Sequence, residues 1–391
     1  MKIAYVPNTV FPWEIGGVQK RVQKIGHRLP DHPDVYWYRL NHSYAESSFP
    51  EYCIDRYTTR TIDGFTGPIC MTGELVSIII PTHFRNEGLR ETLQSVREQV
   101  YEPIEVIVVD DSGDGHARDV VDEFEEVLYI RFPNNRGAQA ARNAGLRLAI
   151  SEYVWFLDDD DRLRSTAVSK QVTALREHPN AGVAVCGIEF THGGFHLPTS
   201  NASRLELERA LEFWNGPFRY STVLVERSVL DTIAPLDETF EGAGDIWMRI
   251  ELAQITDFVA VEEPLVLVAK REQQMEAGEN ADHLGFSRAA LEARWKMFDR
   301  YAALYDKVDP IVRRNALADA YRLEALLHLH SRSWSPRAIL AFARTAYYTP
   351  TNRPQHMAEL AASFFGRPGH KLTRNLRDGA IRRVDRLRGR E

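Results

Sequence analysis

The chain has 391 residues, of which 44% are hydrophobic and 26% are charged, and this is the composition of an ordinary soluble globular protein. Its length predicts two or three domains, and no apolar run approaches the roughly 18 residues that a transmembrane helix needs. The three cysteines, Cys53, Cys70 and Cys186, are few and far apart, which excludes a disulfide framework and a zinc site and predicts reduced thiols in the cytoplasm.

Residues 1–70 are predicted to form a separate N-terminal unit of the βαβ type that ends in a linker. Its first expected strand is 2–6, so we interpret the start of the chain as a strand rather than a signal peptide. A loop with two prolines and two glycines follows, and apolar residues then recur at helical spacing over 18–29. From 57 to 73 the sequence is polar, which indicates the linker.

Residues 74–275 are predicted to form the main domain, because its first part alternates strands and helices regularly. The expected strands are 76–80, 104–109, 128–132, 153–157 and 182–186, and the expected helices are 87–98, 117–126, 138–149 and 166–177. The runs 77–80 and 106–109 are almost wholly apolar, as strands covered on both faces should be. This alternation predicts an α/β fold with a largely parallel sheet.

The pattern changes after residue 190, where a loop at 192–203 precedes less regular elements. We expect strands at 221–225 and 265–269 and a helix at 245–254. Residues 282–391 are predicted to form a helical C-terminal region that ends in a basic tail. Its expected amphipathic helices are 287–304, 311–327 and 336–346.

Three of the expected strands run directly into polar residues. Pro81-Thr82-His83 follows the first, Asp110-Asp111-Ser112-Gly113 follows the second, and four aspartates, 158–161, follow the strand 153–157. In an open parallel sheet, ligands bind beyond the carboxyl ends of the strands. The three strand ends together therefore predict a nucleotide pocket.

The four aspartates, Asp158 to Asp161, would repel one another at the edge of a sheet unless a cation lies among them. Mg²⁺ and Mn²⁺ prefer oxygen ligands and often share them with the phosphates of a substrate. The alternative is a solvated helix N-terminus, where carboxylates interact favourably with the helix dipole. The cluster predicts a Mn²⁺ or Mg²⁺ site and a phosphorylated donor.

Four segments of the chain together resemble the family 2 glycosyltransferases of the GT-A fold. They are VSIIIPTHFRNEGLRETLQSV, EVIVVDDSGD, NNRGAQAARNAGLRLA and EYVWFLDDDDRL, and they agree with the family in order and spacing. The resemblance covers roughly residues 75–268. It implies a GT-A domain, with a mostly parallel sheet flanked by helices, that transfers a sugar with inversion from a nucleoside diphosphate sugar.

The resemblance also implies roles for residues at the first two strand ends. Pro81 and Thr82 would line the pocket of the nucleotide base, and Asp111 would accept a hydrogen bond from the base. Arg142 and Asn143 would lie near the donor, although Arg142 could equally form a structural pair with Asp111.

Asp158 and Asp160 match the DxD signature of the family. Asp160 would bind the metal together with Asp158, and Asp158 and Asp159 would contact the ribose or the water around the metal. The chemistry needs such a cation, because a bound dication neutralises the charge that develops on the diphosphate leaving group.

An inverting transfer also needs a general base that takes the proton of the acceptor hydroxyl. The family supplies it from a Glu-Asp pair before a helix of the type D-L-W-x-R. Residues 245–249 match this helix, but Gly242 and Ala243 stand where the acidic pair is expected. We predict Asp245 as the base and Glu241 as the second choice. The alternative is that Asp245 is an ordinary helix-start residue.

The first 40 residues carry a weaker, second resemblance. MKIAYVPNTVFPWEIGGVQKRVQKIGHRL is similar to the opening strand, Gly-Gly loop and helix of the family 4 glycosyltransferases of the GT-B fold. Only a fragment of that fold precedes the GT-A segments, so we expect it to have a structural or acceptor-side role.

The C-terminal tail is basic, whereas the rest of the chain is acidic. Residues 367–391 hold nine Lys/Arg and three Asp/Glu, a net charge of +6, so residues 1–366 carry −13 of the total of −7. Phe364 and Phe365 precede the tail. Such an end favours an anionic membrane surface, with packing against the body or simple solvation as alternatives.

The sequence therefore predicts a metal-dependent inverting glycosyltransferase that is cytoplasmic and peripheral at the inner face of a membrane. Its partners would be a nucleoside diphosphate sugar and a glycan or lipid-linked acceptor, without nucleic acid. A non-catalytic glycosyltransferase-like binding protein is the alternative that the missing acidic pair supports. A nucleotidyltransferase is less favoured, because PTHFRNEG is not the Gly-rich basic loop expected after its first strand.

Overall fold

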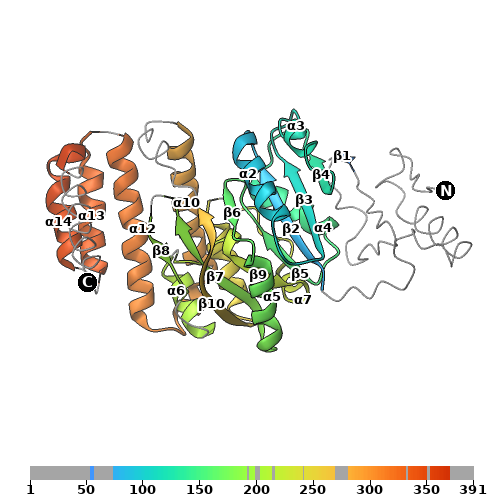
Figure 1. The fold of residues 1–391 in the computed structure, drawn as a ribbon. Helices are drawn as coiled ribbons and strands as arrows, with labels where there is room; N and C mark the ends of the chain where they lie inside the picture. Colours follow the sequence, from blue (N-terminus) through green and yellow to red (C-terminus); the bar gives the residue numbers. More distant parts are fainter. Residues whose placement is uncertain are drawn as a thin grey trace, which may run out of the picture.

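The computed structural model describes residues 53–56 and 74–369, except 192, 199–202, 214–215, 241, 269–280, 332 and 350–352. Figure 1 shows a central sheet with helices on both sides and a further stack of helices toward the C-terminus. Apart from the strand β1, the predicted N-terminal unit lies outside the described residues. Among the helices that the structure describes, none combines the length and apolarity needed to cross a bilayer.

The sheet has ten strands in the order β1-β4-β3-β2-β5-β9-β7-β10-β6, with β8 paired to β7 at its side. The strands are β1 Cys53–Arg56, β2 Val76–Thr82, β3 Ile104–Asp110, β4 Val127–Arg131, β5 Tyr153–Phe156, β6 Asp161–Leu163, β7 Ala181–Phe190, β8 Phe195–His196, β9 Val223–Glu226 and β10 Asp257–Val268. Strands β4, β3, β2 and β5 are parallel to one another. Strand β9 is antiparallel to both β5 and β7, so β7 and β10 run in the same direction as β5. The expected α/β fold with a mostly parallel sheet is confirmed, and β1, β6, β8 and β9, which are antiparallel to their neighbours, make the sheet mixed.

The helices cover both faces of the sheet and continue into the C-terminal stack. They are α2 Asn86–Arg97, α3 Arg118–Val121, α4 Ala138–Leu148, α5 Ala167–Glu177, α6 Ser203–Leu211, α7 Arg227–Ile233, α8 Gly244–Leu252, α10 Ala281–Arg300, α11 Ala302–Tyr305, α12 Pro310–Ser331, α13 Pro336–Tyr348 and α14 Arg353–Ser363. A short 3-10 turn, Tyr220–Thr222, leads into β9.

The apolar run of β2 is buried on both faces, as the sequence predicts. Ile79 packs into one core with residues of α4 and α8, whereas Ile78 and Ile80 pack into a second core with residues of α2, α3 and α5. All three isoleucines are 0% exposed. Successive side chains of a strand point to opposite faces, so two helical layers are needed to cover this run.

Several predicted elements differ in length from the observed ones, as the helix expected at 117–126 and the strand expected at 265–269 illustrate. The helix expected at 117–126 is only one turn, Arg118–Val121, in which Val120 and Val121 are buried. The strand expected at 265–269 extends back to Asp257, since β10 pairs with β7 along most of its length. Pairing with β7 keeps polar residues within β10, although the local sequence pattern does not predict a strand there.

The C-terminal helices join the main core and then form a smaller one. Met297 of α10 and Ala316 of α12 belong to the same core as α8. Further along, α12, α13 and α14 pack together, and Arg322 of α12 forms an ion pair with Glu359 of α14 at 2.9 Å. The division of the chain near residues 275–282 stays a prediction.

Candidate active site

The polar ends of β2, β3 and β5 lie at one edge of the sheet, as the sequence predicts. Pro81 pairs in register with Val109, and Thr82 pairs with Asp110. The backbone N–H of Asp111 donates to the carbonyl oxygen of Thr82 at 2.9 Å. The parallel pairing of β2 with both neighbours therefore places the three polar segments next to one another.

Asp111 holds the loop that begins α4. Its carboxylate accepts the backbone N–H of Arg136 at 2.6 Å and that of Gly137 at 2.8 Å. Burial raises the pKa of Asp111, and these two N–H groups oppose the rise. Gly137 has φ +89°, a conformation that suits glycine, and it lets the chain turn into the helix. The predicted contact of Asp111 with a base stays a prediction.

Arg142 pairs with the aspartate cluster and not with Asp111, the structural partner that the sequence left open. Its Nη2 lies 2.6 Å from Asp158 Oδ1, and its Nη1 donates to Gln139 Oε1 at 3.0 Å. The guanidinium lies 3.8 Å from the centre of the Tyr220 ring, and the Tyr220 hydroxyl donates to the same Gln139 oxygen. The side chain of Arg142 is thus fixed with its charge toward Asp158.

The four aspartates alternate between exposed and buried side chains. The side chains of Asp158 and Asp160 are 36% and 23% exposed, whereas the residues Asp159 and Asp161 are 3% and 5% exposed. Burial raises the pKa of Asp159 to about 6 and also raises that of Asp161. Asp158 and Asp160, the two residues of the DxD match, are therefore the ones whose oxygens can reach a ligand.

Asp159 is occupied by contacts within the chain. It accepts the Thr82 hydroxyl at 2.8 Å and Arg85 Nη1 at 2.9 Å, and Arg85 also reaches Asp160 at 3.3 Å. The helix α2 comes close here, since a Cβ on Gly88 would lie 2.7 Å from the Asp159 carbonyl oxygen. Sequence reasoning missed Arg85, because nothing local shows that an arginine before α2 faces a turn about 75 residues away.

Asp245 is at the start of α8 and lies near the same cluster. A Cβ on Gly244 would lie 2.8 Å from the Tyr220 hydroxyl and 2.4 Å from Gln139 Nε2, so the helix begins directly against the Tyr220–Gln139–Arg142 group. Asp245 accepts the N–H of Ile246 at 2.9 Å. Burial raises its pKa, and Arg219 and Arg142 oppose this rise. The second choice, Glu241, lies outside the described residues.

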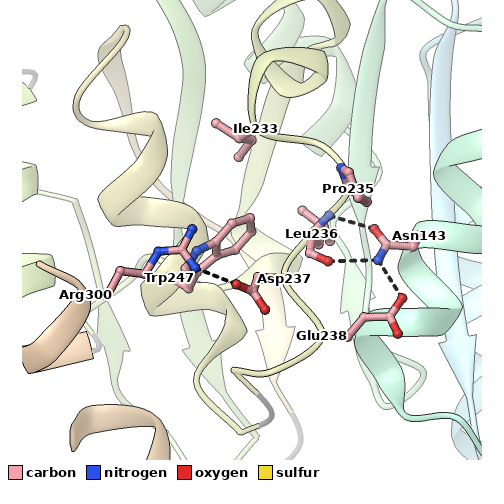
Figure 2. A pocket seen from close by; sticks show the side chains of 8 residues that line it. All are labelled: Asn143, Ile233, Pro235, Leu236, Asp237, Glu238, Trp247 and Arg300. Carbon is pink, nitrogen blue, oxygen red and sulfur yellow. Dashed lines mark hydrogen bonds and ion pairs between the residues drawn. The ribbon is translucent and has the colours of Figure 1, made fainter. Parts of the chain in front are cut away.

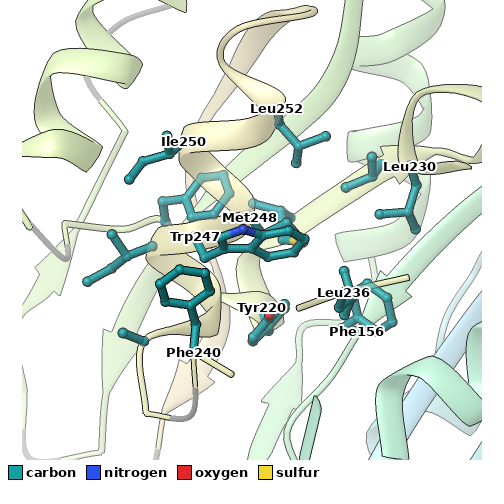
Figure 3. Packing of buried hydrophobic residues seen from close by; sticks show 14 of the residues in the cluster. Phe156, Tyr220, Leu230, Leu236, Phe240, Trp247, Met248, Ile250 and Leu252 are labelled. Carbon is teal, nitrogen blue, oxygen red and sulfur yellow. The ribbon is translucent and has the colours of Figure 1, made fainter. Parts of the chain in front are cut away.

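The helix α8 is held in place by apolar side chains that pack into the main hydrophobic core. Trp247, Met248, Ile250 and Leu252 are each at most 3% exposed, and Figure 3 shows them packed around Phe240, Tyr220 and their neighbours. The Trp247 and Phe240 rings stack with centroids 6.4 Å apart. This packing fixes the direction in which α8 presents its first turn to the aspartates.

The side-chain amide of Asn143 is occupied by hydrogen bonds within the chain. Its amide accepts the N–H of Leu236 at 2.8 Å and donates to the Leu236 carbonyl at 2.9 Å and to Glu238 at 3.0 Å (Figure 2). A cavity of about 410 Å³ opens beside it, lined also by Asp237, Trp247 and Arg300 among others. None of Asp158 to Asp161 lines this cavity, so we locate the candidate site by its charged groups.

Comparison with known proteins gives a family match to the sequence of this region. Residues 77–233 match the model of Glycosyl transferase family 2. The match supports the family 2 resemblance over this segment, which holds the first three strand ends and the aspartates. The resemblance of the N-terminal segment to family 4 receives no such support and stays a prediction.

Two curated relatives share part of this segment. The UDP-Glc:alpha-D-GlcNAc-diphosphoundecaprenol beta-1,3-glucosyltransferase WfaP of Escherichia coli is 37% identical over 101 residues, which are 25% of this chain and 40% of the relative. The putative teichuronic acid biosynthesis glycosyltransferase TuaG of Bacillus subtilis is 31% identical over 138 residues, 34% of this chain and 51% of the relative. The chain thus spans about half the length of the relatives that it matches.

Among solved structures, the mannosyltransferase PcManGT from Pyrobaculum calidifontis, in complex with GDP-Man and Mn²⁺, is 19% identical. The alignment covers 79% of this chain and 86% of that one, with a TM-score of 0.48. TarS 1–349 of S. aureus is 18% identical, with coverage of 73% and 91% and a TM-score of 0.45.

Proposed function

We propose that this chain is a glycosyltransferase that moves a sugar, with inversion, from a nucleoside diphosphate sugar to a glycan or lipid-linked acceptor. The observation that carries the proposal is the convergence of Thr82, Asp111 and the aspartate cluster at one edge of the sheet, within a segment that matches family 2. The WfaP relative, by its name, uses UDP-glucose and a diphosphoundecaprenol-linked sugar, which supports both substrate classes.

Mn²⁺ or Mg²⁺ would be held by Asp158 and Asp160. The residues fit such an ion, because both carboxylates are partly exposed and hard dications prefer oxygen ligands. In the part of the chain that the structure describes, no three His, Cys, Asp or Glu side chains are grouped to hold a metal, so the donor and water would have to supply further ligands. When bound, the ion would neutralise charge on the diphosphate leaving group.

Asp245 would take the proton of the acceptor hydroxyl. It is the acidic residue of the family's helix pattern that this chain retains, and α8 fixes it beside Arg142 and Asp158. Arg142 would position Asp158, and Pro81, Thr82 and Asp111 would form the base pocket.

A screen of nucleotide sugars tests the proposal. Purified protein with Mn²⁺ should be stabilised against heat by one nucleoside diphosphate sugar above the others, because a ligand that binds the native state raises its melting temperature. The same donor should be hydrolysed slowly or transferred, and omission of the metal should remove this turnover. Binding without any turnover would instead favour the non-catalytic binding protein that the missing acidic pair suggests.

We propose that the protein reaches its acceptor by contact with an anionic membrane surface. Trp334, Phe364 and Phe365 are 54%, 60% and 76% exposed, and Trp334 Nε1 donates to the Phe364 carbonyl at 3.1 Å, so the three aromatics lie at one end of the helical stack. Arg367, where the basic tail begins, is tied to Ser333 beside them through a backbone hydrogen bond of 2.8 Å. Exposed aromatics next to basic residues suit the interface of an anionic bilayer.

Deletion of residues 367–391 should release the protein from liposomes that contain anionic lipid. Each basic residue near such a surface contributes about 1 kcal/mol, weakened by salt, so high salt should reproduce the effect of the deletion. Co-sedimentation at low and high salt measures this, and activity on a soluble acceptor analogue should be retained. If the full chain does not sediment with anionic liposomes at low salt, the membrane partner is wrong.

A further inference from the structure

Arg219 is a cation of the candidate site without a partner among the described residues. Its Nε is buried and has no hydrogen-bond acceptor, and its guanidinium forms no ion pair within 4.0 Å in the described part of the chain. The residue was not predicted as part of the site, because it precedes an expected strand in a stretch without a motif. A buried N–H that stays unpaired is costly, so its retention points to a ligand.

The position of Arg219 is fixed by its neighbours in sequence. Ser221 Oγ accepts the backbone N–H of Asp158 at 3.1 Å, and the Ser221 carbonyl accepts the indole N–H of Trp155 at 2.9 Å. Tyr220, which lies between Arg219 and Ser221 in the sequence, stacks on Arg142. The segment 219–221 therefore runs alongside the aspartate turn.

Charge agrees with this placement. Arg219 also opposes the rise that burial causes in the pKa of Asp245, so its charge acts at the start of α8. Arg142 contributes a second buried Nε without an acceptor in the same region. Two guanidinium groups with unused N–H donors form a site that suits an anion with several oxygens.

We propose that Arg219, with Arg142 beside it, binds a phosphate group in the candidate site. A guanidinium matches phosphate because its planar fork offers several N–H donors to the oxygens at once. The phosphate can belong to the diphosphate of the donor or to an acceptor that carries phosphate. This assignment rests on the proposed function, because it gives the anion a place in the transfer reaction.

Binding of inorganic pyrophosphate with Mg²⁺ tests the site without a nucleotide. Arg219→Gln should weaken pyrophosphate binding about 10- to 100-fold in calorimetry, as expected for loss of a charge-assisted hydrogen bond. Arg219→Lys should restore part of the loss, since lysine keeps the charge but not the fork. Arg337→Gln, an exposed arginine on the first turn of α13, is the matched control and should not change binding.

Two further measurements distinguish the sources of the phosphate. If the donor supplies it, Arg219→Gln should weaken UDP or GDP binding by the same factor and leave uridine or guanosine binding unchanged. If the acceptor supplies it, nucleotide binding should stay constant, and KM should rise for an alkyl diphosphate-linked N-acetylglucosamine but not for the alkyl glycoside that lacks phosphate.

The outcomes separate this proposal from the proposed function. Pyrophosphate binding that depends on Arg219, in a protein that binds no nucleotide sugar, would support the phosphate site and contradict the glycosyltransferase. Equal pyrophosphate binding by wild type and Arg219→Gln, with both proteins folded by circular dichroism, would overturn the role of Arg219 even if the enzyme is active.

Discussion

Asp160→Asn is expected to lower the rate of sugar transfer by about 100-fold or more, the size of effect seen when one electrostatic contact to a transition state is lost. Asparagine keeps the shape of the side chain but removes the charge that a dication needs. The side chain of Asp160 is 23% exposed in the turn between β5 and β6, near the first turn of α2, so the fold should survive the change. Initial rates and donor affinity, measured across a range of Mn²⁺ concentrations, check this result.

The matched control for this prediction is Asp306→Asn. Asp306 lies at the end of α11 with a side chain that is 75% exposed, and it should tolerate the same change without loss of activity. Removal of metal by excess EDTA should reproduce the effect of Asp160→Asn in the wild-type protein. Full turnover in EDTA would contradict the metal site at Asp158 and Asp160.

Asp245→Asn is expected to reduce transfer by about 100- to 10,000-fold, the usual contribution of a general base. Donor affinity should stay nearly unchanged, because the base acts on the acceptor hydroxyl and not on the nucleotide. Asp245 contacts the backbone of its own helix only through the N–H of Ile246, and asparagine can accept that bond as well. The measurement is kcat for transfer together with calorimetric binding of the donor nucleotide.

Glu241→Gln provides the comparison for Asp245. If Glu241→Gln abolishes transfer and Asp245→Asn does not, the base is Glu241. If neither variant affects transfer, Asp245 is an ordinary helix-start residue. A chain that binds donor with wild-type affinity and transfers nothing would favour the non-catalytic alternative.

The sequence was sufficient to predict the strands and helices of the first half of the sheet and the sheet edge at which the candidate site lies. The runs in β2 and β3 are apolar throughout and the helices between the strands have a clear helical period, so each element could be recognised locally. Because parallel strands end at the same edge, Thr82, Asp111 and the aspartates could be placed together without knowledge of any contact. Elements such as β6 and α6 were missed, since they are short or weakly patterned.

The tertiary structure alone decided which charged groups face one another. Asp158 pairs with Arg142, and Asp159 pairs with Arg85, while Arg219 has no ion-pair partner among the described residues. Nothing in the local sequence distinguishes these three arginines. Strand β9 likewise enters the sheet between β5 and β7 from a distant part of the chain. Hydrophobic period and turn residues are properties of neighbouring positions, whereas an ion pair depends on side-chain direction after distant segments have packed. For this reason the sequence predicts where the site is, and the packed structure determines how its charges are arranged.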